Sequence, residues 1–293
     1  MSARCYLVTV VVIASLISYD FPAAAGTITI KGSDTLVILS QKWAQHYMSM
    51  NPQTKIQVTG GGSGVGLAAL QNNNTDIANA SRSIRPAERA ACIKAFGRNP
   101  REYKVALDSL LVYVHPSNPI DELSLEQLRA IYTGRIRNWE QLGGLDSPIS
   151  LYSRENSSGT YEFFKAHVLK GRDFIATAQT MPGTAAVIQA VAKEPNGIGY
   201  GGAAYGHGAK HLRIKKTPTS PAIEPSEENI LSGQYPIWRF LFNYLNPAKD
   251  KGEIGDFLHW VRSDEGQAVV KEVGYYPLPP DHRVAQDDRK RPD

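Results

Sequence analysis

Apolar residues along this chain alternate between two periodicities. Short runs rich in β-branched residues, at 27–30 and 56–59, have the composition of strands, and a glycine-containing turn follows each of them. After the first turn, Leu36, Leu39 and Trp43 recur at helical spacing. This repetition of strand, turn and helix predicts an α/β fold with mainly parallel strand pairing.

The rest of the chain continues the alternation. Residues 104–115 form a long β-rich run, residues 196–202 form a second strand flanked by glycines, and residues 236–245 are strand-like. Residues 253–273 have a helical pattern, and residues 215–228, rich in Pro, Ser and Thr, are predicted to be a surface connection.

Two helix starts carry recognisable signals. Ser124 and Gln127 make a capping-box sequence ahead of an apolar helical pattern. Pro86 suits the first turn of the helix that we expect to follow it.

Composition limits the possible classes of protein. The chain has 293 residues, 42% of them apolar and 20% charged, which is typical of a globular protein long enough for two domains. Its formal net charge is only +4, and no basic cluster is interleaved with aromatic residues. We therefore expect no nucleic-acid partner.

Residues 1–25 have the pattern of an export signal. Arg4 supplies positive charge, residues 6–17 are apolar but too short to span a bilayer comfortably, and three alanines end at Ala25. We expect cleavage after Ala25 and a periplasmic mature protein. Removing Cys5 leaves Cys92 alone, so no internal disulfide is expected, and a buried apolar role is commoner for such a cysteine than a nucleophilic one.

The turn that opens the helical pattern at 158–169 has the chemistry of an anion site. Ser157, Ser158 and Thr160 offer hydroxyls, and Gly159 lets a ligand approach the backbone closely. The first N–H groups of a helix have no internal partner and carry the positive end of its dipole. Arg154, four residues before Ser158, adds a guanidinium that can bind an oxyanion through two parallel hydrogen bonds. For a single Ser or Thr, plain helix capping is the commoner role.

Three further turns repeat these residue types, and this repetition favours an anion site over plain helix capping. Their candidate residues are Ser33, Asp34 and Thr35 in the first turn, Ser63 in the second, and Ser81 and Arg82 in the third. Four turns of small residues and two arginines predict a pocket for a small, dehydrated anion.

Other kinds of site fit the sequence less well. The spacing G-x-G-x-x-A at 64–69 resembles a dinucleotide fingerprint, but no acidic residue follows at the end of a second strand. Ser63 misses the G-x-S-x-G pattern of serine hydrolases, because Val65 occupies its last position. His207 and His211 lack a third ligand for a metal. We expect no catalytic residue, metal or cofactor.

From about residue 27 to about residue 279, the chain resembles the phosphate-binding proteins of ABC importers, in the type II periplasmic binding protein superfamily. The motifs that carry this resemblance stand in the usual order: GSDT at 32–35, GGGSG at 60–64, NASR at 79–82 and SRENSSGT at 153–160. Supporting segments are LSLEQLRAIYTGRIRNWEQLGG at 123–144, NGIGY at 196–200 and SGQYPIWRFLFNYL at 232–245.

This resemblance implies a two-lobed fold, each lobe a mainly parallel sheet flanked by helices. Lobe 1 would comprise 26–111 and 204–293, and lobe 2 would comprise 112–203, with hinge strands near 110–114 and 199–203. The implied phosphate ligands are Ser33, Thr35, Ser63, Ser81, Arg82, Arg154, Ser158, Gly159 and Thr160. The resemblance also implies an ABC permease in the inner membrane as partner, and a monomer.

One residue departs from the pattern of the family. The best-known members place an aspartate after the serine of the third motif, where it accepts the proton of phosphate, and this chain has Arg82 there. Because sulfate has no such proton, an acceptor carboxylate discriminates against it. Either the pocket favours the dianion by charge alone or another carboxylate serves. Asp34 is the candidate, with helix capping as an equally weighted alternative.

Two alternatives to phosphate capture remain from the sequence. The same fold binds other tetrahedral oxyanions, such as sulfate, molybdate or arsenate. Some relatives with this fold are described as phosphatases, although the sequence shows neither an activated nucleophile nor a metal pair.

Overall fold

The computed structural model describes residues 26–283. The expected export signal at 1–25, with its cleavage site after Ala25, lies outside the described residues, as does the segment 284–293. Within the described range, no helix combines the length and the apolar composition that crossing a bilayer requires.

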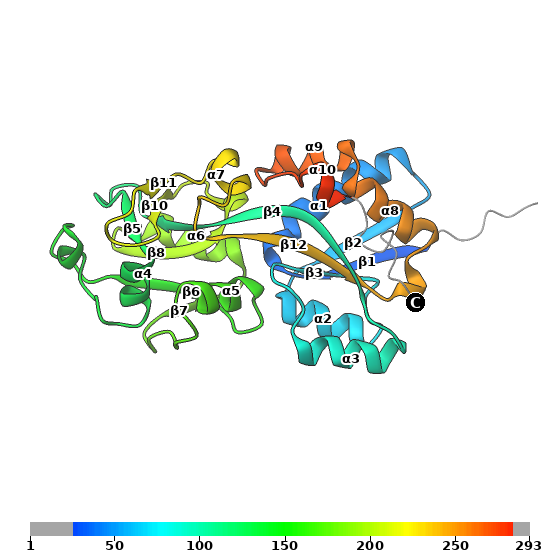
Figure 1. The fold of residues 1–293 in the computed structure, drawn as a ribbon, viewed down its shortest axis with the longest axis horizontal. Helices are drawn as coiled ribbons and strands as arrows, with labels where there is room; N and C mark the ends of the chain where they lie inside the picture. The colour runs from blue at the N-terminus through cyan, green and yellow to red at the C-terminus, as the bar shows by residue number, and fades with distance from the viewer. Residues whose placement is uncertain (1–25, 284–293) are drawn as a thin grey trace, which may run out of the picture.

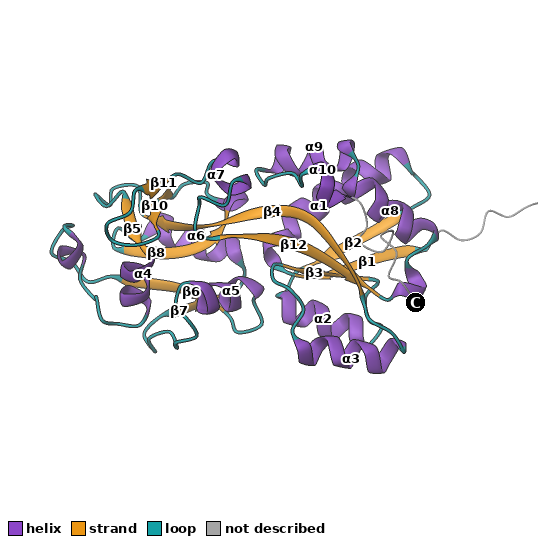
Figure 2. Cartoon of the chain, viewed as in Figure 1, coloured by secondary structure: helices purple, strands orange, loops and turns teal. Residues whose placement is uncertain are grey.

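The first lobe is a small parallel sheet covered by helices on both faces (Figures 1 and 2). Its elements are β1 (Thr27–Gly32), β2 (Lys55–Thr59), β3 (Ile77–Ala80), α1 (Val37–Met50), α2 (Ser63–Gln71), α3 (Pro86–Phe96), α8 (Gly252–Arg262) and α9 (Asp264–Val273). Strand β1 lies in the centre and pairs in parallel with β2 and β3. Helices α1, α8 and α9 cover one face, and α2 and α3 cover the other.

The second lobe repeats this plan. Its elements are β5 (Glu122–Ser124), α4 (Leu125–Tyr132), β6 (Ser150–Arg154), α5 (Gly159–His167), β7 (Gln179–Met181), α6 (Thr184–Lys193) and β8 (Gly197–Gly202), followed by β9 (Lys210–His211), β10 (Arg213–Lys215), β11 (Ala222–Ile223) and α7 (Glu227–Leu231). Strand β6 pairs in parallel with β7 and β8. Strands β5, β10 and β11 form a separate three-stranded sheet.

Two long strands run between the lobes, β4 (Arg101–Val114) and β12 (Trp238–Leu245). They pair antiparallel with each other, and they join both lobes into one sheet of order β2-β1-β3-β12-β4-β8-β6-β7. Strand β4 contributes Val105 and Ala106 to the core of the first lobe and Val112 and Val114 to that of the second. A continuous apolar strand therefore connects two separate cores. The predicted α/β fold is confirmed, with mainly parallel pairing inside each lobe and antiparallel pairing along the crossing strands.

The second crossing strand differs from the expected hinge at 199–203. That segment belongs to β8, which lies inside the sheet of the second lobe between β4 and β6. The chain then stays in the second lobe: β10 pairs with β5, and Leu212, Ile214 and Ile230 lie in the same core as Leu123. Residues 210–231 thus pack with the second lobe, contrary to the division at residue 204, and the chain returns through β12.

Local signals mark the helix starts well, with one exception. Ser124 and Gln127 form the predicted capping box, in which the Gln127 N–H donates to Ser124 Oγ at 3.1 Å, and α3 begins at Pro86. The helical pattern at 253–273 is two helices instead of one, because Ser263 is extended and caps α9. The segment 215–228, predicted to be a connection, contains the short strand β11.

Candidate functional site

The four predicted turns lie together where the two lobes meet. A short 3-10 turn, Asp34–Leu36, leads into α1, and the N-termini of α2 and α5 lie beside it. The hydroxyls of Thr35, from the first lobe, and Thr160, from the second, are 2.8 Å apart. Because one residue belongs to each lobe, and they are 125 positions apart in sequence, this contact directly joins the lobes at the candidate site.

The first lobe presents two serines at the ends of neighbouring elements. Ser63 opens α2 and Ser81 follows β3, and both side chains are fully buried. The Ser81 N–H donates to Ser63 Oγ at 3.0 Å, and the two Oγ atoms are 3.4 Å apart. The fold therefore brings together these two predicted ligands.

The second lobe presents the start of α5. Ser158 Oγ accepts hydrogen bonds from the N–H groups of Thr160 and Tyr161, so Ser158 caps the helix. A Cβ on Gly159 would lie only 2.3 Å from Ser63 Oγ. The Gly64 N–H of the first lobe also donates to the Ser157 carbonyl at 3.0 Å. The absence of a side chain at Gly159 thus allows the two lobes to approach this closely.

Arg154 ends β6 and is only 2% exposed. Its Nε and Nη2 donate in parallel to the two carboxylate oxygens of Glu155 at 3.1 and 2.7 Å. Nη2 also pairs with Asp34 Oδ2 at 2.6 Å across the lobes, and Nη1 donates to Thr184 Oγ1 at 2.8 Å. Burial alone would raise the pKa of Glu155, but the hydrogen bonds and the charge of Arg154, together with backbone hydrogen bonds, lower that pKa. The two parallel bonds expected toward an oxyanion are thus made to Glu155.

Asp34 contacts both lobes without capping its own helix. Its Oδ1 accepts a hydrogen bond from the Gly61 N–H at 2.9 Å, and its Oδ2 accepts from Arg154. Within the described chain, Ser33 precedes the 3-10 turn with no side-chain cap. These contacts speak against the capping alternative for Asp34, and the proton-acceptor alternative stays a prediction.

Arg82 is buried at the lobe interface, but its donors are directed at carboxylates. Nη1 and Nη2 donate to the two oxygens of Glu88 at 2.8 Å each. Nε lies 2.9 Å from Glu162 Oε2, on α5 of the second lobe. Arg82 therefore links the lobes through an ion pair, and this geometry favours a closing role over direct anion binding.

The pKa of Glu88 gives a testable consequence of this cluster. Burial would raise this pKa, but the hydrogen bonds from Arg82 and Arg85 outweigh burial and lower it from 4.5 to about 2. Because the folded pKa lies below the unfolded one, ionised Glu88 stabilises the fold above about pH 4.5, and this stability disappears as the pH falls toward 2.

We expect Glu88→Gln to lower the free energy of unfolding by about 3 kcal/mol at about pH 7, and by much less at about pH 2. Urea unfolding at both pH values measures this difference. Glu126→Gln, at an exposed carboxylate on α4, is the control and should change neither value. An equal loss at both pH values would show that Glu88 acts through packing alone.

Two buried residues of the crossing strands also reach the site, and the sequence motifs missed both. Arg239 on β12 pairs with Asp108 on β4: its Nε and Nη2 lie 3.0 and 2.8 Å from Asp108 Oδ2. Nη2 also donates to Thr160 Oγ1 at 3.1 Å and lies 3.5 Å from Thr35 Oγ1. Burial raises the pKa of Asp108 against the pull of Arg239. The available signal was one charged residue in each of two otherwise apolar strand segments.

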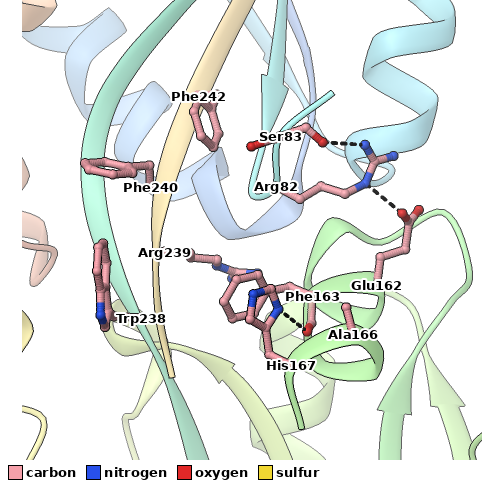
Figure 3. Close-up of a pocket in the computed structure, with 10 residues that line it drawn as sticks. All are labelled: Arg82, Ser83, Glu162, Phe163, Ala166, His167, Trp238, Arg239, Phe240 and Phe242. Atoms are coloured by element: carbon pink, nitrogen blue, oxygen red, sulfur yellow. Dashed lines mark hydrogen bonds and ion pairs between the residues drawn. The ribbon is translucent and has the colours of Figure 1, made fainter. Parts of the chain in front are cut away.

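A cavity of about 410 Å³ lies beside Arg239 and Arg82 (Figure 3). Its walls are largely aromatic, from Phe163, Trp238, Phe240 and Phe242. Figure 3 shows the Arg239 side chain extending from β12 toward Phe163, whose ring centroid is 5.3 Å from the guanidinium carbon. A second cavity of about 480 Å³ is lined by Asp34, Glu155 and four other residues. Arg239 and Arg82 thus line an aromatic hollow, while Asp34 and Glu155, the two carboxylate partners of Arg154, line the second cavity.

The uncharged donors around the site suit an anion. Three buried arginines are each matched by carboxylates, while the hydroxyls and helix N-termini add donors without formal charge. In residues 26–283, no group of three or more His, Cys, Asp or Glu side chains is arranged to hold a metal ion. Polar donors from two lobes, with two crossing strands between the lobes, define a two-lobed ligand-binding protein.

Comparison with known proteins identifies the family. The model of the PBP superfamily domain matches residues 21–265. Phosphate-binding protein PstS of Pseudomonas aeruginosa is 34% identical over 271 residues, covering 87% of this chain and 84% of that protein. Phosphate-binding protein PstS of Bacillus subtilis is 31% identical over 265 residues, covering 90% and 84%. The chain belongs to the PBP superfamily and, within it, to the family of these phosphate-binding proteins.

Solved structures agree with this assignment. A chain from Clostridium perfringens crystallised with bound phosphate has a TM-score of 0.79 and 26% identity, covering 87% of this chain and all of that one. An ABC-type phosphate transport receptor from Vibrio cholerae has a TM-score of 0.68 and 27% identity, covering 86% of this chain and all of that one. The two-lobed fold is therefore shared with phosphate-binding proteins of known structure.

Proposed function

We propose that this protein captures inorganic phosphate between its two lobes outside the cytoplasm and delivers it to an ABC permease. The observation that carries the proposal is the meeting of donors from both lobes, with Thr35 and Thr160 2.8 Å apart and Ser63, Ser81 and Gly159 beside one another. The names of its relatives and the phosphate in one structural neighbour support the choice of anion.

Capture requires that the site replace the water shell of the ion. Hydroxyls of Ser33, Thr35, Ser63 and Ser81 would bind one side of the ion, and the helix start at Ser158–Thr160 would bind the other. Backbone N–H groups at helix N-termini bind phosphate well because they have no intrahelical partners and carry the positive end of the dipole. The interlobe ion pairs Asp34–Arg154 and Arg82–Glu162 would stabilise the closed state.

The cellular location and the partner of the protein follow from the same proposal. The N-terminal pattern supports export with cleavage after Ala25, and the family supports a periplasmic protein that works as a monomer with permease subunits in the inner membrane.

We propose no catalytic role and no cofactor. Incubation with a chromogenic phosphate ester should therefore give no turnover, and hydrolysis that follows the purified protein would favour the phosphatase alternative.

Calorimetric titration of ligand-depleted protein tests the anion. We expect phosphate to bind more tightly than sulfate or molybdate, and arsenate to bind nearly as well as phosphate, because arsenate has the same shape and similar ionisation. Equal affinity for sulfate and phosphate would contradict the assignment of phosphate, and no binding of any oxyanion would reject the function as a whole.

Asp34→Asn tests how the site distinguishes phosphate from sulfate. If the Asp34 carboxylate accepts the phosphate proton, its amide replacement should narrow the preference for phosphate over sulfate by about tenfold or more. The variant should also weaken both anions together, because it removes the pairing partner of Arg154. The measurement is the ratio of the two dissociation constants.

Glu155→Gln is the matched control for this ratio. Glu155 also pairs with Arg154 and borders the same cavity, but it lies outside the proposed proton contact. Its amide variant should leave the ratio of the two dissociation constants near the wild-type value. A ratio that is unaltered in Asp34→Asn would remove the acceptor role from Asp34.

A further inference from the structure

Arg239 occupies an unusual position for a residue of a crossing strand. Its side chain is only 2% exposed, and it lies directly opposite Asp108 in the register of β12 and β4. The guanidinium extends beyond Asp108 to the hydroxyls of Thr160 and Thr35, one from each lobe. It therefore reaches the point at which the lobes meet.

The three buried arginines near the site differ in the donors that they have left. Arg82 directs both Nη atoms at Glu88, and its Nε, which makes no hydrogen bond, still has a carboxylate partner in Glu162 Oε2 at 2.9 Å. Arg154 directs its nitrogens at Glu155, Asp34 and Thr184. Arg239 uses Nε and Nη2, while its Nη1 is buried and has no hydrogen-bond partner within residues 26–283. A buried guanidinium N–H without an acceptor is costly, since it loses its water and gains nothing in return.

An anion between the lobes would supply the missing acceptor. Nη1 and Nη2 are bonded to the same carbon, and Nη2 already contacts the hydroxyls of Thr35 and Thr160. An oxyanion held by those two hydroxyls therefore lies within reach of the guanidinium. We propose that Arg239 is a direct ligand of the bound anion and that Asp108 is the positioning residue that aims it.

This assignment rests on the proposed function and changes its ligand set. The sequence motifs assign the guanidinium contacts to Arg82 and Arg154, whose nitrogens are directed mainly at carboxylates. Arg239 instead comes from β12, and its partner Asp108 comes from β4, so the contact belongs to the two strands that connect the lobes. Because Asp108 Oδ1 also accepts the Ala203 N–H at 3.1 Å, the aspartate is fixed against the end of β8.

The first test is Arg239→Lys, read by calorimetric titration with inorganic phosphate. Lysine keeps a positive charge beside Asp108 but lacks the planar fork that reaches past it. We expect the dissociation constant for phosphate to rise at least tenfold while the melting temperature of the ligand-free protein changes little. Arg213→Lys, at an exposed ion pair with Glu122, is the matched control and should bind as the wild type does.

The second test separates ligand contact from a structural role. The double variant Asp108→Asn/Arg239→Met removes both charges of the pair, so neither is left buried alone. A ligand contact to Arg239 should make wild-type affinity rise as phosphate loses its second proton near neutral pH, and the double variant should show a weaker rise. A purely structural role would change stability without changing this pH profile.

The outcomes are distinct. Wild-type protein that binds no phosphate would reject the proposed function, and the variants would then be irrelevant. Wild-type protein that binds phosphate, with Arg239→Lys binding equally well, would overturn the assignment of Arg239. A double variant that is folded by circular dichroism and has both the wild-type affinity and the wild-type pH profile would overturn it as well.

Discussion

Arg154→Met should weaken phosphate binding by about 100-fold or more, the largest loss expected from any single side chain of the site. Removing one partner of a buried charge cluster costs about 3–5 kcal/mol, because the remaining charges lose their compensation. Here the remaining charges are Asp34 and Glu155, which would then face the bound anion without the guanidinium between them. The loss therefore combines missing attraction with new repulsion.

Arg154→Lys distinguishes charge from geometry at the same position. An ammonium keeps the charge but cannot make the parallel pair of bonds to Glu155 together with the contacts to Asp34 and Thr184. We expect an intermediate loss of about tenfold, measured by the same phosphate titration. The near-ultraviolet circular dichroism of both variants should match the wild type. Wild-type affinity in the methionine variant would show that Arg154 supports the fold and not the ligand.

The sequence predicts those parts of the site that depend on local signals. Each candidate turn joins a strand to a helix, and such a turn places its hydroxyls and N–H groups at the helix N-terminus whatever the rest of the chain does. Ser63 at the start of α2 and Ser158 at the start of α5 illustrate this. These turns meet because open α/β sheets bring the carboxyl ends of parallel strands to one edge.

Pairings between distant segments cannot be predicted from local sequence signals. Arg239 and Asp108 are separated by 131 residues, and each stands alone in an apolar stretch. Only the antiparallel register of β12 and β4 brings them together. The same limit applies to Arg82, which follows the predicted ligand Ser81 in sequence but is directed at Glu88 and, from the other lobe, at Glu162.

The misplaced hinge has a related cause. Residues 197–202 have the glycine-rich composition of a connecting strand, but composition does not tell which strands pair with it. Strand β8 pairs with β4 and β6 and lies inside the second lobe. The strand that crosses is β12, in which Trp238, Phe240 and Phe242 line the aromatic cavity, Leu241 packs in the core of the first lobe, and Arg239 reaches Thr160 of the second lobe.

Gly159→Ala should abolish tight phosphate binding while leaving each lobe folded. The added Cβ would lie 2.3 Å from Ser63 Oγ and 2.7 Å from Ser81 Oγ, well inside contact distance. Ser63 Oγ accepts the Ser81 N–H and lies 3.4 Å from Ser81 Oγ, so both serines belong to the first lobe, whereas Gly159 begins a helix of the second. The methyl group would therefore act between the lobes and hold them apart, instead of straining either one.

Calorimetry and small-angle X-ray scattering together check this expectation. We expect a loss of affinity of about 100-fold or more, because an ion contacted by one lobe alone loses half of its donors and stays hydrated. The radius of gyration of the variant should not shrink when phosphate is added, whereas that of the wild type should. Gly64→Ala is the matched comparison, since its Cβ would stand 3.4 Å from Ser157 O at the same interface, and its loss should be below about tenfold. If Gly159→Ala binds phosphate and contracts as the wild type does, the ion is not held between these two helix starts.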